Sequence, residues 1–227
     1  MKIALCLSGQ PRNIEEGYKS IFANFIEPYD CDVFIHTWSN GFPQERIEKL
    51  KELYKPVSMQ VDKCHTPVCD YSNLRYVYGP QKIYDMSSQY DSIARANKLR
   101  NKYEEETNIH YDCVIRCRMD LHFNKRVYLE KYSMDVLHTR LENVCKYNGL
   151  HSDFGFGNKN IMDQYAKCFE NIIPIYQRLH RENPLNIPEN LMLASEIILG
   201  QTIRYVCQVP VEEHPGPDDI SFYIIRN

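Results

Sequence analysis

The chain has 227 residues, a formal net charge of −3 and 43% hydrophobic residues. This length suits one large domain or two small ones and can bury a substantial core. The slightly acidic charge gives no electrostatic basis for nucleic-acid binding, so we expect no nucleic-acid partner. No apolar run approaches the length that spans a bilayer, so we expect no transmembrane segment, and the oligomeric state stays open.

The start of the chain and its cysteines predict a cytoplasmic protein. Met1 and Lys2 lead directly into Ile-Ala-Leu-Cys-Leu, which is too short for a secretory signal and lacks a cleavage site. The nine cysteines are odd in number, and several fall in predicted strands, where cysteine acts as a small buried hydrophobe. We expect reduced thiols. Cys64 and Cys69 have no second ligand pair, so ordinary cysteines are preferred to a zinc site there.

The first forty residues predict a βαβ unit. An apolar run over residues 2–8 reads as a buried strand, and a helix is expected over about 14–25, with Asn13 as its N-cap. A second apolar strand follows at 32–37. Strand, helix and strand at this spacing predict an α/β fold with a mostly parallel sheet flanked by helices.

The loop after the first strand is a candidate anion site. It contains Ser8, Gly9, Gln10 and Arg12, and it lies at the carboxyl end of a predicted parallel strand, where open α/β sheets bind ligands. A helix N-terminus beside an arginine suits a phosphate or diphosphate. The loop has neither a P-loop pattern nor G-x-G-x-x-G, so the signal is general, and an ordinary loop arginine is the alternative.

The middle of the chain continues the alternation of helices and strands. We expect a short charged helix at 44–54, a strand at 56–61, an irregular stretch at 62–79 and a helix at 87–106. The apolar stripe of the last helix should pack on the sheet, and its other face carries polar side chains that could reach a ligand. These are Gln89, Ser92, Arg95 and Asn97.

Residues 111–123 read as one central strand. The odd positions from Cys113 to Phe123 are all apolar, and the even positions are mostly ionisable. The ionisable face ends in Asp120 and His122, a pair that could bind a hard or borderline cation at the end of a buried strand. The alternative is a surface strand with one solvated face.

The second half of the chain has a looser pattern. We expect a strand-like stretch at 136–144, a Gly-aromatic strand within 151–158, one or two helices over 159–181 broken at Pro174, a helix at 188–199 and a strand at 204–209.

Several of these motifs together resemble a known family. The stretches Leu-Cys-Leu-Ser-Gly-Gln-Pro-Arg-Asn, Cys-Asp-Val-Phe-Ile-His-Thr-Trp and Tyr-Asp-Cys-Val-Ile-Arg-Cys-Arg-Met-Asp occur in this order. Ser-Asp-Phe-Gly-Phe-Gly and Pro-Glu-Asn-Leu-Met-Leu follow them. The chain thereby resembles small stand-alone glycosyltransferase-like proteins of bacteria and large DNA viruses. The resemblance implies a single GT-A-type domain over 1–227, with a nucleotide-sugar-binding half (1–123) and an acceptor-side half (124–227).

The resemblance also implies a donor and a metal. It implies a nucleotide-diphospho-sugar donor, a glycan, lipid-linked sugar or protein-glycan acceptor, and Mn²⁺ or Mg²⁺. The implied donor-binding residues are Ser8, Gly9, Gln10, Arg12, Ser92, Arg118 and Asp120, and the implied metal ligands are Asp120, His122 and His214. His122 stands where the family pattern has a carboxylate. The alternative is that Arg118 neutralises the diphosphate in place of a metal.

Hexosyl or deoxyhexosyl transfer with inversion requires a carboxylate base near the acceptor hydroxyl. Asp153 is the first candidate because it precedes a Gly-rich turn, and Glu189 is the second. Their alternatives are a turn cap for Asp153 and a first-turn acid favoured by the helix dipole for Glu189. The sequence does not decide between inversion and retention.

Two other functions compete with sugar transfer. The Asp-x-His departure favours a non-catalytic nucleotide-sugar-binding module. A sugar nucleotidyltransferase is third, since it would normally have a Gly-rich basic loop where this chain has one glycine.

Overall fold

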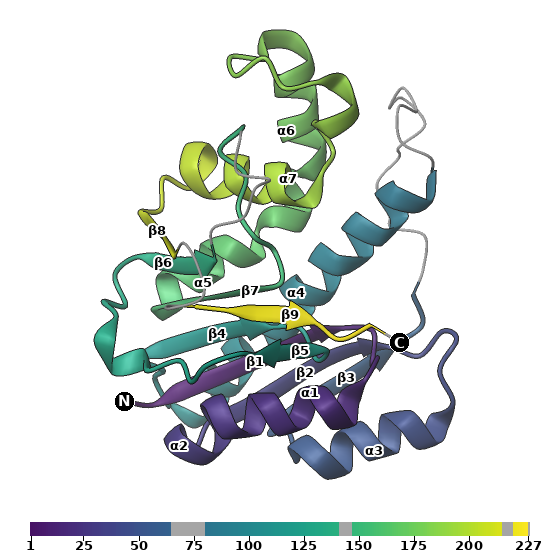
Figure 1. The fold of residues 1–227 in the computed structure, drawn as a ribbon, viewed down its shortest axis with the longest axis vertical. Coiled ribbons are helices and arrows are strands. Elements are labelled where there is room, and N and C mark those ends of the chain that lie inside the picture. Colours follow the sequence, from purple (N-terminus) through teal and green to yellow (C-terminus); the bar gives the residue numbers. More distant parts are fainter. Residues whose placement is uncertain (65–79, 141–146, 215–219, 227) are drawn as a thin grey trace.

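The computed structural model describes residues 1–64, 80–140, 147–214 and 220–226 (Figure 1). It is a mixed α/β structure built on a seven-stranded sheet with the order β3-β2-β1-β4-β7-β6-β8. The strands of this sheet are β1 (Ile3–Gly9), β2 (Asp32–Trp38), β3 (Ser58–Asp62), β4 (Cys113–Cys117), β6 (Leu137–Arg140), β7 (Phe154–Gly157) and β8 (Val211–His214). A separate antiparallel pair is formed by β5 (Leu121–Phe123) and β9 (Phe222–Ile224).

The sheet is mostly parallel, which confirms the predicted fold class and the βαβ start. The pairs β1–β2, β2–β3, β1–β4 and β6–β8 are parallel, and β7 runs antiparallel to both β4 and β6. The β4–β7 pair joins the two halves of the chain in one sheet.

Helices cover both faces of the sheet, with α1 and α3 on one face and α4 to α7 on the other (Figure 1). The α-helices are α1 (Ile14–Ile21), α2 (Glu27–Tyr29), α3 (Gln44–Tyr54), α4 (Pro80–Thr107), α5 (Lys159–Ala166), α6 (Cys168–Glu182) and α7 (Ser195–Gln201). Two π-helical segments, Phe22–Ile26 and Thr202–Val206, and two 3-10 turns, Leu129–Lys131 and Glu189–Leu191, complete the described helices.

The strand β1 is apolar throughout because both of its faces are covered. Leu5 and Leu7 pack in the core cluster that contains Ile14 of α1, whereas Ala4 and Cys6 pack in the cluster under α4. All four side chains are buried. A central parallel strand needs such a continuous run, and this explains why no alternation is visible there.

The order of the strands creates a switch point beside β1. From β1 the chain adds β2 and then β3 on one side, and β4 joins the other side of β1 after the long helix α4. The loops after β1 and β4 therefore diverge from neighbouring carboxyl ends. Ligands of open α/β sheets bind in the crevice at such a point.

The single strand predicted over 111–123 is wrong. It ends at Cys117, and the chain turns before β5 begins in the other sheet. The backbone of α1 explains the turn: a Cβ atom at Gly17 would lie 1.8 Å from the Met119 carbonyl oxygen, so the helix approaches the turn directly. The Asp120 carbonyl oxygen accepts a 2.9 Å hydrogen bond from the Ile225 N–H, which holds the turn from its other side.

Other predicted boundaries also differ. The strand expected at 204–209 is wrong, because Thr202–Val206 is π-helical with Ile203 buried, and the edge strand β8 follows at Val211. The break expected at Pro174 lies instead between α5 and α6, and Pro174 is inside α6. The helix expected at 188–199 is a 3-10 turn followed by α7. The strand-like stretch 136–144 contains β6, and its end lies outside the described residues.

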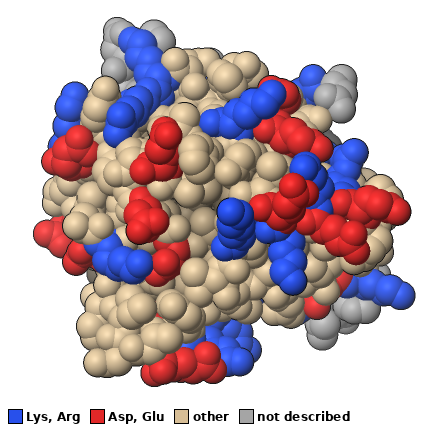
Figure 2. Space-filling model, turned by 90° about the horizontal axis from the view of Figure 1, so that it is seen from below, with Lys and Arg blue, Asp and Glu red and all other residues tan. Residues whose placement is uncertain are grey.

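The cysteines, the helices and the surface charge of the described residues show no special feature. The seven cysteines in the described part of the chain are free thiols, and Cys69 and Cys145 lie outside it. No described helix has the length and apolarity needed to cross a membrane. On the face that carries α1 and α3, acidic and basic side chains are interspersed, with no field of one sign (Figure 2).

Candidate functional site

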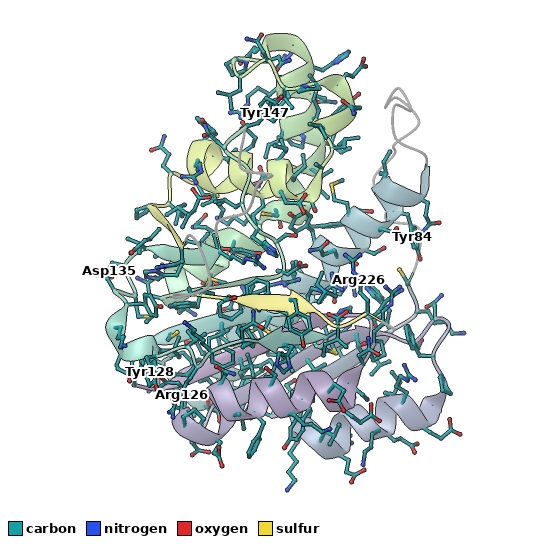
Figure 3. The ribbon with its side chains drawn as sticks, in the orientation of Figure 1. Tyr84, Arg126, Tyr128, Asp135, Tyr147 and Arg226 are labelled. Carbon is teal, nitrogen blue, oxygen red and sulfur yellow. The ribbon has the colours of Figure 1, made fainter. Side chains whose placement is uncertain are left out.

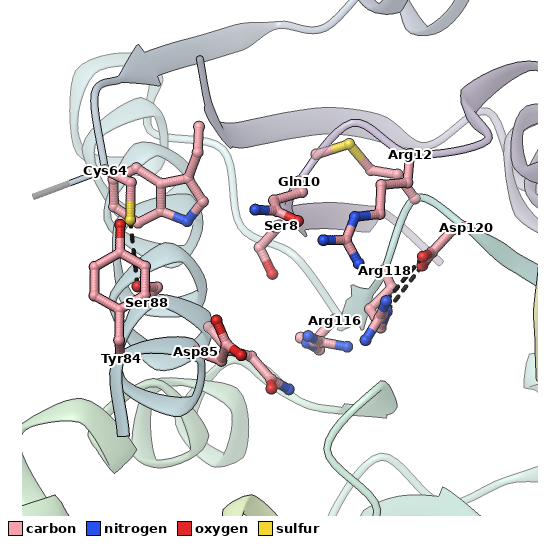
Figure 4. A pocket seen from close by; sticks show the side chains of 14 residues that line it. Ser8, Gln10, Arg12, Cys64, Tyr84, Asp85, Ser88, Arg116, Arg118 and Asp120 are labelled. Carbon is pink, nitrogen blue, oxygen red and sulfur yellow. Dashed lines mark hydrogen bonds and ion pairs between the residues drawn. The ribbon is translucent and has the colours of Figure 1, made fainter. Parts of the chain in front are cut away.

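A cavity of about 230 Å³ opens beside the carboxyl ends of β1 and β4. It therefore occupies the switch point of the sheet, as the loop sequence predicted. One wall comes from the start of α4 and the opposite wall from the Gly9–Arg12 loop and the turn after β4 (Figure 4).

The loop after β1 is held in place by its own backbone. Gly9 has φ +116°, a conformation that side chains rarely adopt. Its N–H donates to Ser92 Oγ at 2.9 Å, and its carbonyl oxygen accepts from Thr37 Oγ1 at 2.8 Å. Glycine is needed here so that the chain can leave the strand and present Arg12 to the cavity.

Ser92 belongs to a buried chain of polar groups behind this loop. Its Oγ lies 2.8 Å from His36 Nδ1, and His36 Nε2 lies 3.2 Å from Asp62 Oδ2, which also accepts from Arg95 at 2.8 Å. Burial lowers the pKa of His36, which favours the neutral ring. Ser92 is fully buried and does not line the cavity, so these groups support the loop and do not touch a ligand there.

Arg116 is the most unusual residue of the cavity. Its side chain is on β4, and the residue is only 3% exposed. Within the described residues its guanidinium makes one hydrogen bond, from Nη1 to the Asp153 carbonyl oxygen, and no ion pair with a carboxylate; Nε has no partner. An unpaired buried charge is costly, so the arrangement favours an anion as the missing partner.

Arg118 organises two acids at the edge of the cavity. Its Nε and Nη2 donate to the two carboxylate oxygens of Asp120, each at 2.8 Å, and Nη1 lies 3.2 Å from Asp153 Oδ1. Burial alone would lower the pKa of Arg118, but these two acids raise it above its usual value. The guanidinium therefore stays charged.

The far wall of the cavity is aromatic and uncharged over part of its length. Tyr84 and Ser88 project from the first turns of α4, and Cys64 lies beside them (Figure 4). Cys64 Sγ is 3.3 Å from Ser88 Oγ. A hydrogen bond with Cys64, assisted by burial, raises the pKa of Tyr84 to about 12, so its hydroxyl is protonated at neutral pH.

A second cavity, of about 520 Å³, adjoins the first. The two share Arg12, Arg118 and Asp120. The second adds Arg46 from α3 and Arg226 from the C-terminal segment, so four arginines face one carboxylate. Arg226 lies on the same side of the molecule as Tyr84 (Figure 3). The combined site is thus cationic at its centre.

Comparison with known proteins identifies a family. A family model described as a domain of unknown function, DUF7796, matches residues 1–183. The chain belongs to this family. The matched residues include the Gly9 loop, Arg116 and the Arg118–Asp120 turn, whereas Arg226 of the second cavity lies beyond them. No functionally curated protein matches the sequence.

Solved structures of mannosyltransferases are similar to the chain at low identity. Core-mannan synthase A (CmsA/Ktr4) from Aspergillus fumigatus, in a Mn/GDP form, is 10% identical with a TM-score of 0.45. The match covers 99% of this chain and 75% of that one. The mannosyltransferase Ktr4p from S. cerevisiae in complex with GDP is 9% identical with a TM-score of 0.46, covering 98% and 70%. TM-scores below 0.5 leave the function to be argued from the site.

Six of the residues predicted to bind the donor are brought together by the structure. Ser8, Gly9, Gln10, Arg12, Arg118 and Asp120 all line the first cavity. Asp153 lines neither cavity, but its Oδ1 lies 3.2 Å from Nη1 of Arg118, which lines both. Glu189 does not join them: it is exposed in the Glu189–Leu191 turn and lines neither cavity.

The Mn²⁺ or Mg²⁺ implied by the family resemblance does not fit the residues around Asp120. Both oxygens of that carboxylate already accept from Arg118. The ring of His122 stacks on the ring of Tyr223, with 4.9 Å between their centroids, and His122 lines neither cavity. His214 Nε2 lies 2.9 Å from His138 Nδ1. The three predicted ligands therefore do not converge, and the cation at this position is a guanidinium.

Several residues of the two cavities escaped the sequence analysis, among them Asp85 and Ser88 of α4. Arg116 occupies one of the mostly ionisable even positions of the predicted strand, and that alternation was the available signal. Tyr84 was missed because the helix was expected to begin at residue 87, whereas α4 begins at Pro80 and contains Tyr84. Arg46 and Arg226 come from distant parts of the chain, and no local sequence pattern links them to the site.

Proposed function

We propose that the protein is a glycosyltransferase that moves a sugar from a nucleotide-diphospho-sugar donor to a hydroxyl acceptor. The observation that carries the proposal is Arg116, a buried guanidinium that lines the switch-point cavity and has no carboxylate partner in the described chain. A donor diphosphate would supply the missing charge. The motif resemblance described above supports the same class of enzyme.

The two ends of the cavity match the two ends of a nucleoside diphosphate. Tyr84 offers an aromatic ring at one end, and Arg12, Arg116 and Arg118 surround the other. Ser8 and Gln10 lie between them (Figure 4) and offer polar groups to a ribose. In this arrangement the diphosphate lies where the two cavities meet, and the sugar extends into the second.

The transfer forms one bond and breaks another at the anomeric carbon. The acceptor oxygen bonds to that carbon, the bond to the diphosphate oxygen breaks, and the nucleoside diphosphate leaves with the electron pair. The sugar passes through an oxocarbenium-like state, as in glycoside hydrolysis. Negative charge grows on the leaving diphosphate, so fixed guanidinium groups of Arg12, Arg116 and Arg118 stabilise the transition state electrostatically.

Asp153 is our candidate for the base that takes the acceptor proton if transfer inverts the anomeric centre. Its carboxylate lies beside the cationic end, 3.2 Å from Arg118 Nη1 and 3.8 Å from His151 Nδ1. The alternative role as a turn acid is also compatible with these contacts, so a variant must separate the two.

A nucleotide panel tests the donor site. We expect at least one of UDP, GDP, CMP and dTDP to raise Tm, because a ligand that binds the native state stabilises it. At a hundred times Kd the gain is about 2.7 kcal/mol, or roughly 5–10 °C for a chain of this size. EDTA should leave the shift unchanged, since Arg118 replaces the metal. The matching nucleosides without phosphate are the control, and a panel with no shift contradicts the proposal.

Asp153→Asn tests the base. The change keeps the shape of the side chain but removes its basicity, so we expect sugar transfer to fall by about a hundredfold or more. Nucleotide Kd should change little. Glu189→Gln, at the exposed alternative position, should leave transfer unchanged. Wild-type turnover in Asp153→Asn would exclude Asp153 as the base.

A second function is favoured by one contact pattern. Arg118 engages both Asp120 and Asp153, so the two acids at the cationic end are already paired. A nucleotide-sugar-binding module without turnover would use the same cavity. Donor binding by calorimetry, with no nucleoside diphosphate released in the presence of acceptor panels, would support it.

A further inference from the structure

Two histidines and a glutamate converge where the edge strand β8 pairs with β6. His138 is on β6, and Glu212 and His214 are on β8, with His138 opposite Glu212 in the register. One ligand atom from each side chain lies within 4.8 Å of the others. Both histidines are buried and the Glu212 side chain is 58% exposed. None of the three lines either cavity of the proposed donor site.

The orientation of His138 is set by a backbone carbonyl. Its Nε2 lies 2.6 Å from the Ser133 carbonyl oxygen, which can only accept, so Nε2 carries the proton. In the neutral ring, Nδ1 then presents its lone pair, and it faces His214 Nε2 at 2.9 Å and Glu212 Oε2 at 3.7 Å. Metal-binding histidines are oriented in this way by a carbonyl or carboxylate on the second nitrogen.

Aromatic rings enclose the two histidines. Phe156 stacks on the His138 ring with 4.8 Å between centroids, and the Tyr132 ring lies 5.1 Å from each histidine. Such an apolar shell strengthens the interaction of an ion with its ligands. The nearby cation, Arg140, donates to the Phe222 carbonyl oxygen at 2.6 Å and packs on that ring. Glu212 leaves the cluster accessible from solvent.

We infer that His138 Nδ1, His214 Nε2 and Glu212 bind a divalent transition-metal ion of the zinc type. Two imidazoles and one carboxylate are a preferred ligand set for zinc. Tetrahedral zinc places its nitrogens about 3.3 Å apart, given bonds of about 2.0–2.1 Å, so the 2.9 Å separation needs only a small opening. The proton between the rings moves to the other nitrogen of His214, and water fills the fourth position.

This ion would join the last two strands of the sheet. The chain continues from β8 to β9 and then to Ile225, whose N–H bonds to Asp120 in the turn after β4. A bound ion would therefore hold β8, which precedes the residues Ile224 to Arg226 that line the second cavity. Its role is structural, because no ligand of the ion reaches the proposed donor.

Metal titration of the EDTA-treated full chain tests the inference. We expect calorimetry to show one Zn²⁺ bound per chain, with a rise in Tm, and Co²⁺ to give the visible absorption of a tetrahedral site. Glu212→Gln changes an exposed side chain, so the circular dichroism spectrum should be retained while Zn²⁺ affinity falls at least about tenfold. Glu105→Gln, an exposed acid on α4, is the charge-matched control and should bind Zn²⁺ as the wild type does.

Three results would overturn the inference. They are no Zn²⁺ binding by the wild type, equal Zn²⁺ affinity in the wild type and Glu212→Gln, and loss of the Co²⁺ spectrum in Asp120→Asn with retention in Glu212→Gln. The last result would show that the ion binds in the donor cavity and not between β6 and β8. His214→Gln gives a second reading of the same site, and loss of the Co²⁺ spectrum in that variant as well supports the assignment.

Discussion

Replacing Arg116 by methionine is expected to weaken nucleoside diphosphate binding about a hundredfold and to leave the fold at least as stable as before. Arg116 is 3% exposed and has no carboxylate partner in the described chain. Hydrogen bonds to charged groups contribute about 1.5–3 kcal/mol each. Loss of this cation should therefore raise the Kd for the diphosphate about a hundredfold, measured by calorimetry, and lower sugar transfer at least as much.

The stability of the same variant gives the sharper test. A buried charge without an ion-pair partner costs free energy in the folded state, and an apolar side chain of similar volume removes that cost. The Asp153 carbonyl oxygen keeps its hydrogen bond from the Arg118 N–H, so no acceptor is left unsatisfied. The unfolding free energy from urea denaturation should stay equal or rise. A marked loss of stability would show that Arg116 is a structural residue and would remove the main support for the anion site.

Two comparisons isolate the effect of this charge. Arg116→Lys keeps the charge and should retain part of the binding. Arg126→Met removes an exposed arginine that packs on Tyr128 at the opposite end of the sheet (Figure 3), so binding should be unchanged. Arg118 is a poorer choice, because its removal also leaves Asp120 and Asp153 without their shared cation.

The local part of this site was predictable from sequence. An apolar run, one glycine and a helix start placed Ser8 to Arg12 at a strand end, and the structure puts these residues in the cavity. Arg118 and Asp120 also line the cavity, but they lie in the turn after β4 and not on the alternating strand that was predicted. The placement of Ser8 to Arg12 needed only the geometry of a βαβ unit.

The positions of His122 and His214 were not predictable because they depend on long-range register. His122 was expected beside Asp120, but the chain turns against Gly17 of α1 and His122 lies in a second sheet against Tyr223. His214 was expected near Asp120, yet β8 pairs with β6 and brings it to His138. Neither the close approach of α1 nor the β6–β8 pairing leaves a mark on local hydrophobic periodicity.

The largest loss of stability is expected from Arg100, which joins α4 to α5 inside the protein. Arg100 is fully buried, and its guanidinium donates hydrogen bonds to Glu104, Asp163 and Asn97. Lys159 also bonds Glu104, at 2.7 Å. Burial raises the pKa of Asp163, but hydrogen bonds from Asn97 and the charge of Arg100 outweigh it and hold the pKa below its usual value.

Arg100→Met should lower the unfolding free energy by about 3–5 kcal/mol at pH 7, because it leaves Asp163 without an ion pair in the described chain and Glu104 with Lys159 alone. Lys102→Met is the matched control. Lys102 also pairs with an acid four residues on, Glu106, but both side chains are largely exposed, so a loss of no more than about 0.5 kcal/mol is expected. A loss below about 1 kcal/mol in Arg100→Met would contradict a structural role for the buried network.

The pH dependence of this difference identifies its cause. In the wild type the folded pKa of Asp163 is depressed, so its contribution is present above the unfolded pKa and is lost as pH falls through the folded pKa. Arg100→Met removes one of the groups that hold this pKa down, so the folded pKa of Asp163 should rise relative to the wild type, although Asn97 and Asn101 still donate to it. The wild type loses the contribution of Asp163 only below the unfolded pKa of about 3.9, and the variant has less of it to lose. The gap in unfolding free energy should therefore stay nearly constant from pH 7 to about pH 4 and narrow below that pH, whereas a gap caused only by lost packing would stay constant throughout.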